Sequence, residues 1–436
     1  MTTALQNKTV HPRFSEAIRF WWRIGWITFG GTAAHIAVLH DELVVRKRWI
    51  GESEFLHALS HCMLLPGPEA QQLAIYIGWK LHGKKGGIAA GTLFVLPSMF
   101  VLLALSLLYI RFGQLSVVAA MISGLRPGIV ALVVLALLRV AERTLVFPLQ
   151  WVVAMGCFIA MVRIQASLPF IMLGVVFLGV VVGWHRPQLL GGATGTENYS
   201  TEPSALIWRR ISASVARIAL GGSVLWLIPL FCMYVLSPDF GFWKRLSLFF
   251  TQTAFVTLGG SYTVIPYVAH VAVFKYHWLS QSQMLDGFSL AETTPGPLII
   301  VVAFVGFMAG FNHFHGSIFM GTVALVSTTF YTFLPCFVFV FAGAPLIEMT
   351  QRTQSIQSVL RLITAVVVAA MLNLALFLAR GALFPAGLLD LKDLDMFALV
   401  WMAFSFLLLR RFRIGMAPFV GLCLLSGIAH LAVVGS

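Results

Sequence analysis

The chain alternates between long apolar runs and short polar stretches. Most of the apolar runs have about 17 to 25 residues, the length that an α-helix needs to cross a bilayer, and few charged residues interrupt them. We therefore predict an all-α polytopic membrane protein with about thirteen transmembrane segments. The early segments fall at about 14–38, 55–79, 88–110, 117–138, 145–161 and 168–184. The later segments fall at about 211–236, 246–268, 284–310, 318–341, 359–378, 397–409 and 418–434.

Two of these runs contain a Pro-Gly-Pro sequence, Pro66-Gly67-Pro68 in one and Pro295-Gly296-Pro297 in the other. Proline lacks a backbone donor and disfavours helix in the preceding residue, so both helices must break there. Broken backbone at membrane depth survives only where it is buried in protein or lines a wet cavity. Both breaks are therefore candidate functional sites, and packing kinks are the plainer alternative.

The two breaks belong to a duplicated sequence. At an offset of 229 positions, Gly30-Gly31 aligns with Gly259-Gly260, Trp49 aligns with Trp278, and the first Pro-Gly-Pro aligns with the second, without a gap. The chain therefore contains two copies of one unit, each with a broken helix.

Weaker matches, which require an insertion, extend the duplication. Leu96-Pro97-Ser98 matches Leu334-Pro335-Cys336, and Leu125-Arg126 matches Leu360-Arg361. We divide the chain into an N-terminal repeat, a polar linker with one extra transmembrane helix, and a C-terminal repeat. Six segments followed by one extra crossing make the halves inverted repeats, which are typical of secondary transporters when their helices are discontinuous. The three parts are 1–184, 185–245 and 246–436.

Composition agrees with a membrane protein, since 59% of the residues are hydrophobic, 10% are charged and the mean hydropathy is +0.90. The net charge of +13 has two interpretations. Basic residues collect in the cytoplasmic loops of membrane proteins, or the excess positive charge attracts an anionic substrate. A cytoplasmic N-terminus places most basic residues inside. The exception is Arg46-Lys47-Arg48, which a re-entrant Gly-Gly segment would explain. The basic residues are scattered between apolar runs, which disfavours nucleic-acid binding.

Each break restarts as a half-helix whose first N–H groups lack intrahelical partners and carry the positive end of the helix dipole. Such a terminus binds anions, and Pro68 and Pro297 suit its first helical position. In an inverted repeat the two termini face each other, so we predict an anion site between them. The predicted substrate-binding residues are Gly30, Gly31, Pro66, Gly67, Pro68, Gln71, Gln72, Gly259, Gly260, Thr293, Thr294, Pro295, Gly296, Pro297, Arg126 and Arg361.

Two carboxylates flank the breaks. Glu69 follows the first break, and Leu298 is its counterpart in the second copy. Glu292 precedes the second break, and Met63 is its counterpart in the first copy. Acidic groups at membrane depth are costly and usually functional. We predict that both couple transport to a proton or cation, and a helix cap is the alternative for Glu69.

Other charged residues lie near the ends of segments. Arg126 and Arg361 begin corresponding segments and are candidates to attract a dianion, although arginines there often only extend to the interface. Asp41, Glu42 and Asp286 are expected to face water. The sequence has no P-loop, no zinc-spaced His/Cys set and no nucleophile elbow. We therefore expect no enzyme activity, no cofactor, no metal site and no ATP-driven pump.

These residues resemble the chromate ion transporter (CHR) family. The amino-terminal domain of that family is similar to FGGTAAHIAVLHDELVVRKRWI followed by HALSHCMLLPGPEAQQLAIYIGWKLHG. The carboxy-terminal domain is similar to TLGGSYTVIPYVAHVAV followed by LAETTPGPLIIVVAFVGF. The resemblance covers nearly the whole chain, as in the two-domain members. It departs at Thr32, where many members have proline.

The resemblance implies a bacterial inner-membrane protein that exports chromate, a dianion shaped like sulfate, and so gives chromate resistance. We expect alternating access with chromate held by the two half-helix termini. An inside-negative potential favours the exit of an anion by about 2.3 kcal/mol per charge per 100 mV, so uniport and proton-coupled antiport both remain open. Transport of sulfate or another oxyanion is the first alternative. A membrane-embedded chromate reductase or sensor is a weaker one, and the sequence leaves homodimerisation open.

Overall fold

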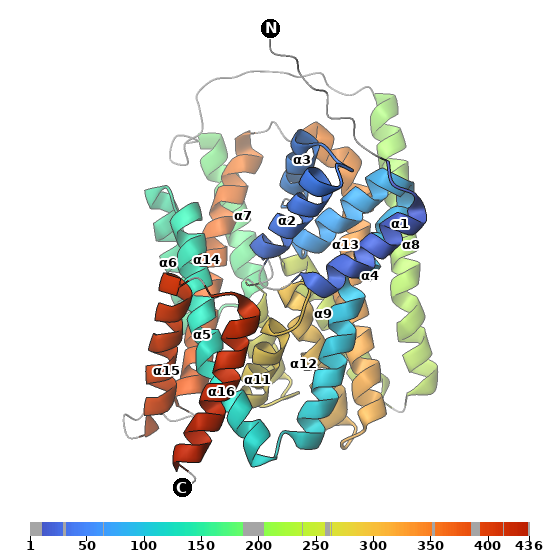
Figure 1. The fold of residues 1–436 in the computed structure, drawn as a ribbon. Helices are drawn as coiled ribbons and strands as arrows, with labels where there is room; N and C mark the ends of the chain where they lie inside the picture. The colour runs from blue at the N-terminus through green and yellow to red at the C-terminus, as the bar shows by residue number, and fades with distance from the viewer. Residues whose placement is uncertain are drawn as a thin grey trace.

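The computed structural model describes residues 11–28, 32–63, 65–185, 205–237, 239–257, 262, 264–350, 354–384, 393–412 and 414–434. Within these ranges the chain is helical and forms no strand, as the long apolar runs predict (Figure 1). The first helices are α1 (Phe14–Ile27), α2 (Thr32–His40), η1 (Asp41–Arg46), α3 (Glu52–Cys62), α4 (Glu69–Phe112), α5 (Ser116–Thr144), α6 (Pro148–Arg163) and α7 (Leu168–His185).

The later helices repeat this series after one additional helix. They are α8 (Ala205–Leu236), α9 (Phe240–Val256), α10 (Ile265–His270), η4 (Val271–Lys275), α11 (Gln281–Glu292), η5 (Leu298–Ile300), α12 (Val301–His313), α13 (Ile318–Thr350), α14 (Gln354–Leu383), α15 (Met396–Leu407), η7 (Leu408–Phe412) and α16 (Met416–Val434).

Seven of the described helices are long and apolar enough to cross a membrane. The chain is therefore an all-α polytopic membrane protein, as predicted. The count of about thirteen segments and the division at 184 and 245 stay predictions. The seven helices are Glu69–Phe112, Ser116–Thr144, Leu168–His185, Ala213–Leu236, Ile318–Gly343, Arg361–Leu383 and Met416–Val433.

Some predicted transmembrane segments are not continuous helices. The Pro-Gly-Pro sequences account for two of the breaks, but two more follow Thr28 at the end of α1 and Thr257 at the end of α9. A 14-residue helix such as α1 is only about 21 Å long, which is shorter than a hydrocarbon core of about 30 Å. The runs 55–79 and 284–310 are thus broken at their Pro-Gly-Pro sequences, as predicted. The runs 14–38 and 246–268 were predicted as continuous segments, and this was wrong.

Helix α4 joins two predicted segments across a kink. It has 44 residues, but His82 and Gly83 leave helical geometry, and Gly83 has a φ of +62°. The kink separates a half-helix that begins at the first Pro-Gly-Pro from a long helix that descends in the view of Figure 1. In the second copy the same course is divided between α12 and α13.

The two copies exchange backbone hydrogen bonds at their breaks. The N–H of Gly67 donates to the carbonyl of Thr257 at 2.5 Å, and the N–H of Gly296 donates to the carbonyl of Thr28 at 2.7 Å. Each threonine hydroxyl donates to the carbonyl four residues earlier in its own helix, at 2.7 Å. Each Pro-Gly-Pro turn is thus bound to the end of the first helix of the other copy.

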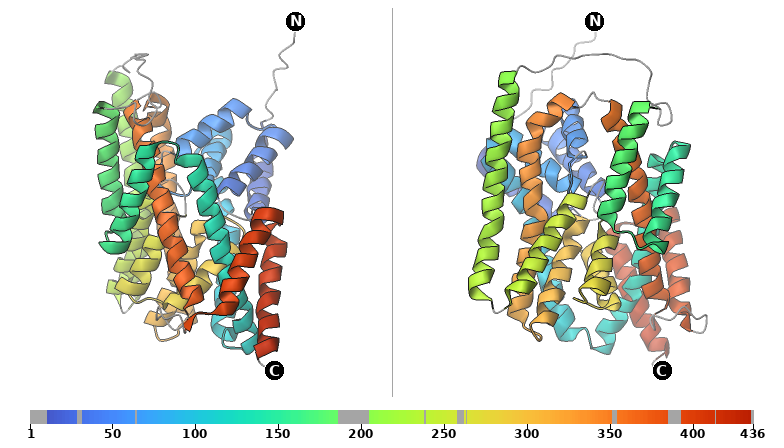
Figure 2. Two further views of the ribbon diagram at one scale, coloured as in Figure 1. Left: turned by 90° about the vertical axis from the view of Figure 1, so that its left-hand side faces the viewer. Right: turned by 180° about the vertical axis from the view of Figure 1, so that it is seen from behind.

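The described helices form two groups with separate hydrophobic cores. The largest core is built mainly from α1–α4 and α9–α13 around buried aromatic side chains such as Trp21, Phe94 and Phe304. Two smaller cores join α5–α7 with α14, and α5 with α15 and α16. The left-hand view of Figure 2 faces this second group. Helices α5 and α14 also contribute residues to the largest core, so they link the groups.

The packing of α16 on α5 depends on glycine. A Cβ added to Gly427 would lie 1.9 Å from the carbonyl oxygen of Ala120, and one added to Gly124 would lie 2.3 Å from that of Cys423. Small residues allow this close approach of membrane helices. Gly421, also in α16, has open space where its Cβ would be.

We predict that Gly427→Leu destabilises the protein by about 1–3 kcal/mol or more, because the side chain must push α16 away from α5. Thermal unfolding of the detergent-purified protein measures this. Gly421→Leu is the matched control, with an expected change within about 0.5 kcal/mol. Equal destabilisation by the two variants would contradict the described packing.

Candidate functional site

Both broken helices restart in the same way. Pro68 precedes the first residue of α4 with φ −69° and ψ 110°, and Pro297 precedes η5 with φ −67° and ψ 133°. Each proline therefore occupies the N-cap position and not the first helical position that the sequence suggested. The extended backbone of an N-cap leaves the N–H groups of the next turn without intrahelical partners. Each restart is thus a buried helix N-terminus. After the second break the N–H of Ile300 donates to the carbonyl of Pro297 at 2.9 Å, because the chain restarts there as the short 3-10 helix η5.

The glycines at the centre of the two turns have backbone conformations that favour glycine. Gly67 has a φ of +123° and Gly296 a φ of +95°. A Cβ on Gly67 would lie 2.8 Å from the sulfur of Cys336, and one on Gly296 would lie 1.7 Å from the hydroxyl oxygen of Ser98. Ser98 and Cys336 are the corresponding positions of the two Leu-Pro-Ser/Cys sequences. Each turn therefore packs on the long helix of the other copy.

Polar side chains surround the first turn. The Gln72 amide nitrogen donates to the carbonyl of Pro66 at 2.5 Å, and the Gln71 amide nitrogen lies 3.4 Å from the carbonyl of Gly91. Both glutamine side-chain oxygens and the hydroxyl of Ser98 are buried and have no hydrogen-bond partner among the described residues. Buried polar atoms in native proteins are nearly always satisfied, so these atoms indicate room for a water or another polar group.

The threonines before the second turn close the end of α11. The Thr293 hydroxyl donates to the carbonyl of Leu290 and the Thr294 hydroxyl donates to that of Ala291, both at 2.7 Å. In this conformation both hydroxyl hydrogens are used in hydrogen bonds to carbonyls of α11, so they are not free to donate to a substrate. The role of Thr293 and Thr294 in substrate binding stays a prediction.

The two predicted coupling carboxyls are both buried but lie at opposite kinds of helix end. Glu69 is the first residue of α4, and only 7% of it is exposed. Glu292 is the last residue of α11, and 3% of it is exposed. The Tyr262 hydroxyl bonds to the Glu292 carboxyl, and the Oε1 atom of Glu292 has no partner among the described residues. A helix N-terminus favours a negative charge and a C-terminus opposes it, so the two carboxyls are not equivalent.

The sequence was compared with known proteins. A family model described as "Chromate transporter" matches residues 15–184 and 244–431. The chain belongs to the chromate transporter family. A chromate transport protein of Pseudomonas aeruginosa is 32% identical over 345 residues, which cover 78% of this chain and 74% of that protein. A chromate transport protein of Cupriavidus metallidurans is 25% identical over 396 residues, which cover 89% of this chain and 90% of that protein. No solved structure matches.

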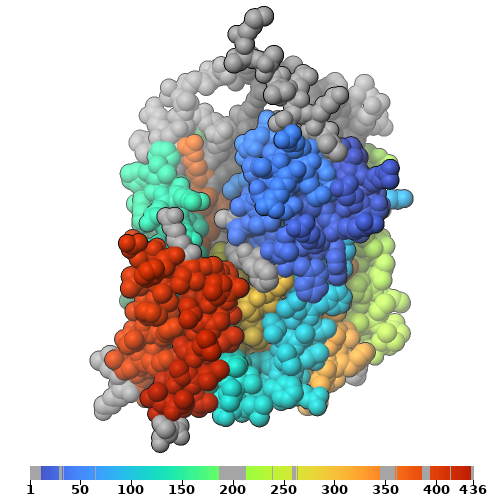
Figure 3. Space-filling model, viewed as in Figure 1, coloured from blue at the N-terminus to red at the C-terminus, as the bar shows by residue number. Residues whose placement is uncertain are grey.

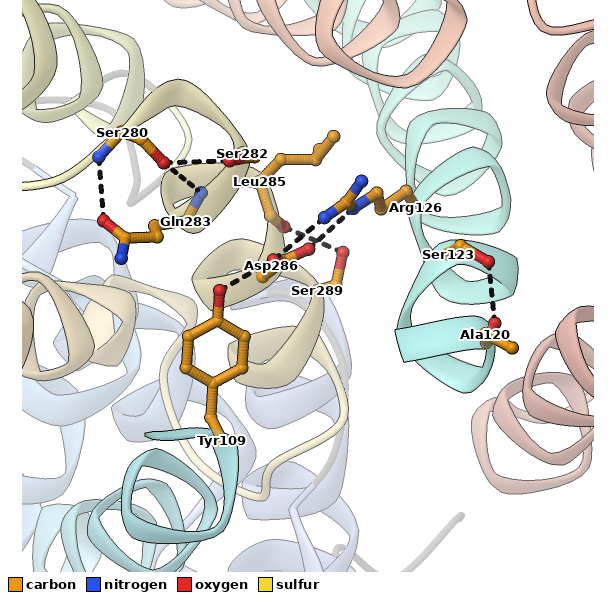
Figure 4. Close-up of polar contacts among 10 residues, drawn as sticks. All are labelled: Tyr109, Ala120, Ser123, Arg126, Ser280, Ser282, Gln283, Leu285, Asp286 and Ser289. Carbon is orange, nitrogen blue, oxygen red and sulfur yellow. Dashed lines mark hydrogen bonds and ion pairs between the residues drawn. The ribbon is translucent and has the colours of Figure 1, made fainter. Parts of the chain in front are cut away.

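In this chromate transporter family member, Arg126 is paired across the two groups of helices. Its Nε and one terminal nitrogen donate to the two carboxylate oxygens of Asp286 in α11 at 2.6 and 2.9 Å, and the Tyr109 hydroxyl donates to the same carboxylate at 2.9 Å (Figure 4). Asp286 was expected to face water, but only 3% of it is exposed. A bidentate ion pair neutralises both charges, so Arg126 offers little free charge to a dianion in this conformation.

Two other expectations about charged residues meet different outcomes. Arg361 lies with its guanidinium 5.4 Å from the centre of the Phe147 ring, a cation–π distance, and its predicted role in substrate binding stays a prediction. Glu42 was expected to face water but is buried, and Arg46 pairs with it at 3.0 Å and with Asp41 at 2.8 Å. Arg46 therefore stabilises a buried carboxylate.

The remaining predicted residues are the two Gly-Gly pairs, Gly30, Gly31, Gly259 and Gly260, which lie outside the described residues. The sequence analysis did not single out Ser98, Cys336, Thr28 or Thr257. The match between Leu96-Pro97-Ser98 and Leu334-Pro335-Cys336 was a sequence signal for Ser98 and Cys336. Since these residues occupy matching positions in the two copies, each packs on the Pro-Gly-Pro turn of the other copy. Nothing local to Thr28 or Thr257 indicated that their carbonyls accept bonds from the other copy.

We predict that Gly296→Ala destabilises this transporter family member by about 3 kcal/mol or more, because its Cβ would overlap Ser98 in addition to the strain of a positive φ. Gly83→Ala is the matched control, since Gly83 also has a positive φ but open space around its Cβ position, and backbone strain alone of about 1–3 kcal/mol is expected there. Thermal unfolding distinguishes the two. Ser98→Gly combined with Gly296→Ala should restore part of the loss. Equal effects of Gly296→Ala and Gly83→Ala would argue against the described contact.

Proposed function

We propose that this protein is a secondary active transporter that exports chromate from the cytoplasm by alternating access and thereby gives chromate resistance. The main support for the proposal is that each broken helix is hydrogen-bonded to the other copy. The N–H of Gly67 donates to the carbonyl of Thr257, and the N–H of Gly296 donates to that of Thr28. Membership of the chromate transporter family and the names of its relatives supply the substrate. Inverted repeats with discontinuous helices at the midplane are the general arrangement of such transporters.

The half-helix N-termini are the proposed chromate site. Gly67 and Gly296 already use their N–H groups to hold the turns together, and Ile300 donates its N–H to the carbonyl of Pro297. The N–H groups of residues 69–71 and 298–299 are therefore the proposed donors for an oxyanion. Two such termini bring two positive dipole ends to one dianion. Glu69 stands at the first terminus, where the second has Leu298, and would repel a bound dianion when it is ionised. This competition gives proton uptake a physical link to anion binding.

Alternating access is supported by a difference between the two copies. Helix α11 packs against α5 and α14, whereas α3, its counterpart in the first copy, makes no comparable contact with either helix in the described part of the chain. Figure 1 shows α3 in the upper half of the view and α11 in the lower half. We infer a conformation closed on the α11 side and open on the α3 side. With a cytoplasmic N-terminus, this conformation faces inward.

The Arg126–Asp286 pair is the proposed gate of the closed side. It joins α5 to α11, and Tyr109 adds the lower end of α4 (Figure 4). Exchange of the two copies turns Arg126 into Arg361 of the second copy and Asp286 into His57 of the first, so the other side lacks a matching carboxylate. The two sides of the transporter would therefore close with different strengths. Opening toward the outside requires that Asp286 separate from Arg126.

Everted membrane vesicles test the proposed function. We expect the native protein to accumulate chromate in them, with faster uptake under an inside-positive potential, and Glu292→Gln to remove the dependence on a proton gradient. Glu54→Gln, which changes a carboxylate that pairs with Lys80 at the surface, is the matched control and should leave both properties intact. Vesicles that accumulate no chromate under any gradient would refute the export proposal. Uptake of sulfate in preference to chromate would favour the oxyanion alternative.

We predict that Asp286→Asn shifts the protein toward an outward-open conformation, because the substitution removes the charge that holds Arg126. The readout is the reaction of a cysteine placed at Ser289, one turn from Asp286 in α11, with a membrane-impermeant thiol reagent applied from outside, in a background without the native cysteines. The rate should rise at least about tenfold, which corresponds to about 1.4 kcal/mol. Asp239→Asn alters an aspartate that pairs with His313 and not with Arg126, and it should not raise the rate. An unchanged rate in Asp286→Asn would exclude the pair as a gate.

A further inference from the structure

A cavity of about 720 Å³ lies between α4, α8 and α13. Its walls are mainly apolar, and buried Gln71 and exposed Lys84 both line it, so it runs from the protein interior to the surface. The volume falls within the range of about 300–1,000 Å³ that is typical of small-molecule sites. Its apolar wall includes Ile88, Val95, Met99, Ile218, Phe330 and Phe337.

The way in which α8 packs leaves this cavity open. Helix α8 stands at the edge of the molecule (Figures 1 and 2) and contacts α13 and α9, but makes no comparable contact with α4 in the described residues. A Cβ on Gly222 would lie 2.5 Å from a methyl group of Val338 in α13, so the two helices touch there. Gly221, the next residue, lines the cavity and has nothing within 4 Å of its Cβ position. No part of the apolar stretch of α8 is buried within the protein, so the cavity borders the lipid.

The charges that line the cavity are both positive. Lys84 and Arg217 line it together, and its lining contains no carboxylate. Both side chains belong to exposed residues, and neither takes part in an ion pair among the described residues. The Arg217 Nε donates to the carbonyl of Ala213 at 3.2 Å, which leaves its terminal nitrogens for another acceptor. The cavity therefore combines an apolar interior with exposed cations.

We propose that this cavity binds an anionic phospholipid, with an acyl chain between α4, α8 and α13 and the phosphate held by Lys84 and Arg217. Basic pockets between membrane helices bind anionic head groups. A site for a small hydrated anion is less suitable, because such an anion does not match the apolar walls. Lysine and arginine side chains often extend to the membrane interface, but this alone does not account for the cavity. The proposal does not rest on the proposed function, since it concerns a different ligand and the basic end of the cavity. Gln71 at the inner end is also a predicted substrate-binding residue.

Binding of lipid to the detergent-purified full-length protein tests this inference, with native mass spectrometry as the readout. The probes are phosphatidylglycerol and phosphatidylcholine with identical acyl chains. We expect tighter binding of phosphatidylglycerol, and a loss of affinity of roughly 10–30-fold in the double variant Lys84→Gln/Arg217→Gln, because each cation near a head group contributes to binding. Gly221→Phe should reduce the binding of phosphatidylglycerol by filling the cavity from α8.

The matched control is the double variant Lys85→Gln/Arg163→Gln, which removes two exposed cations that do not line the cavity and should retain native affinity. Equal affinity for the two lipids, or an equal loss in the control, would overturn the proposal. Displacement of phosphatidylglycerol by inorganic phosphate at millimolar concentration would also overturn it and indicate a simple anion site. Because the readout is binding, each of these results leaves the proposal of chromate export unaffected.

Discussion

Backbone that leaves a helix inside a membrane must find hydrogen-bond partners within the protein, because hydrocarbon offers none. Here the partners come from the other copy of the repeat. The Gly67 N–H binds the carbonyl at the end of α9, and the Gly296 N–H binds the carbonyl at the end of α1. Neither Pro-Gly-Pro turn would be satisfied in this way if its copy folded alone. The exchanged pair of bonds thus explains why both copies must lie together. The turns require glycine for another reason, since both have a positive φ and no room for a Cβ.

This shared frame carries different side chains in its two halves. Glu69 stands at one helix restart and Leu298 at the other, while Asp286 in α11 corresponds to His57 in α3. A symmetric backbone gives the two membrane faces equivalent ways to open and close. Unequal side chains then give the two faces different energies. Asp286 pairs with Arg126 on one face, and in the proposed mechanism this pair holds that face closed. This difference sets which conformation is more populated without substrate. The net direction of transport comes from the electrochemical gradient of the transported ions.

Much of this structure could be predicted from local sequence. The lengths of the apolar runs indicated an all-α membrane fold, and the Pro-Gly-Pro sequences predicted broken helices because proline acts on its own backbone. The match of Leu-Pro-Ser with Leu-Pro-Cys anticipated residues that pack on opposite turns. The breaks after Thr28 and Thr257 were not predicted, because neither is next to a proline. A re-entrant Gly-Gly segment was raised only to explain the position of Arg46-Lys47-Arg48. The burial of Asp286 also escaped it, because the partner that makes burial tolerable, Arg126, lies 160 positions away in the sequence.

The most direct test of the account is a crystal structure grown with selenate, a dianion shaped like sulfate whose selenium scatters anomalously. The account predicts an anomalous selenium peak beside the Gly67 and Gly296 turns, with the selenate oxygens about 3 Å from the first N–H groups of α4 or η5. A peak confined to the basic loops, with none at the half-helix termini at saturating selenate, would contradict the claim that the exchanged turns form the oxyanion site.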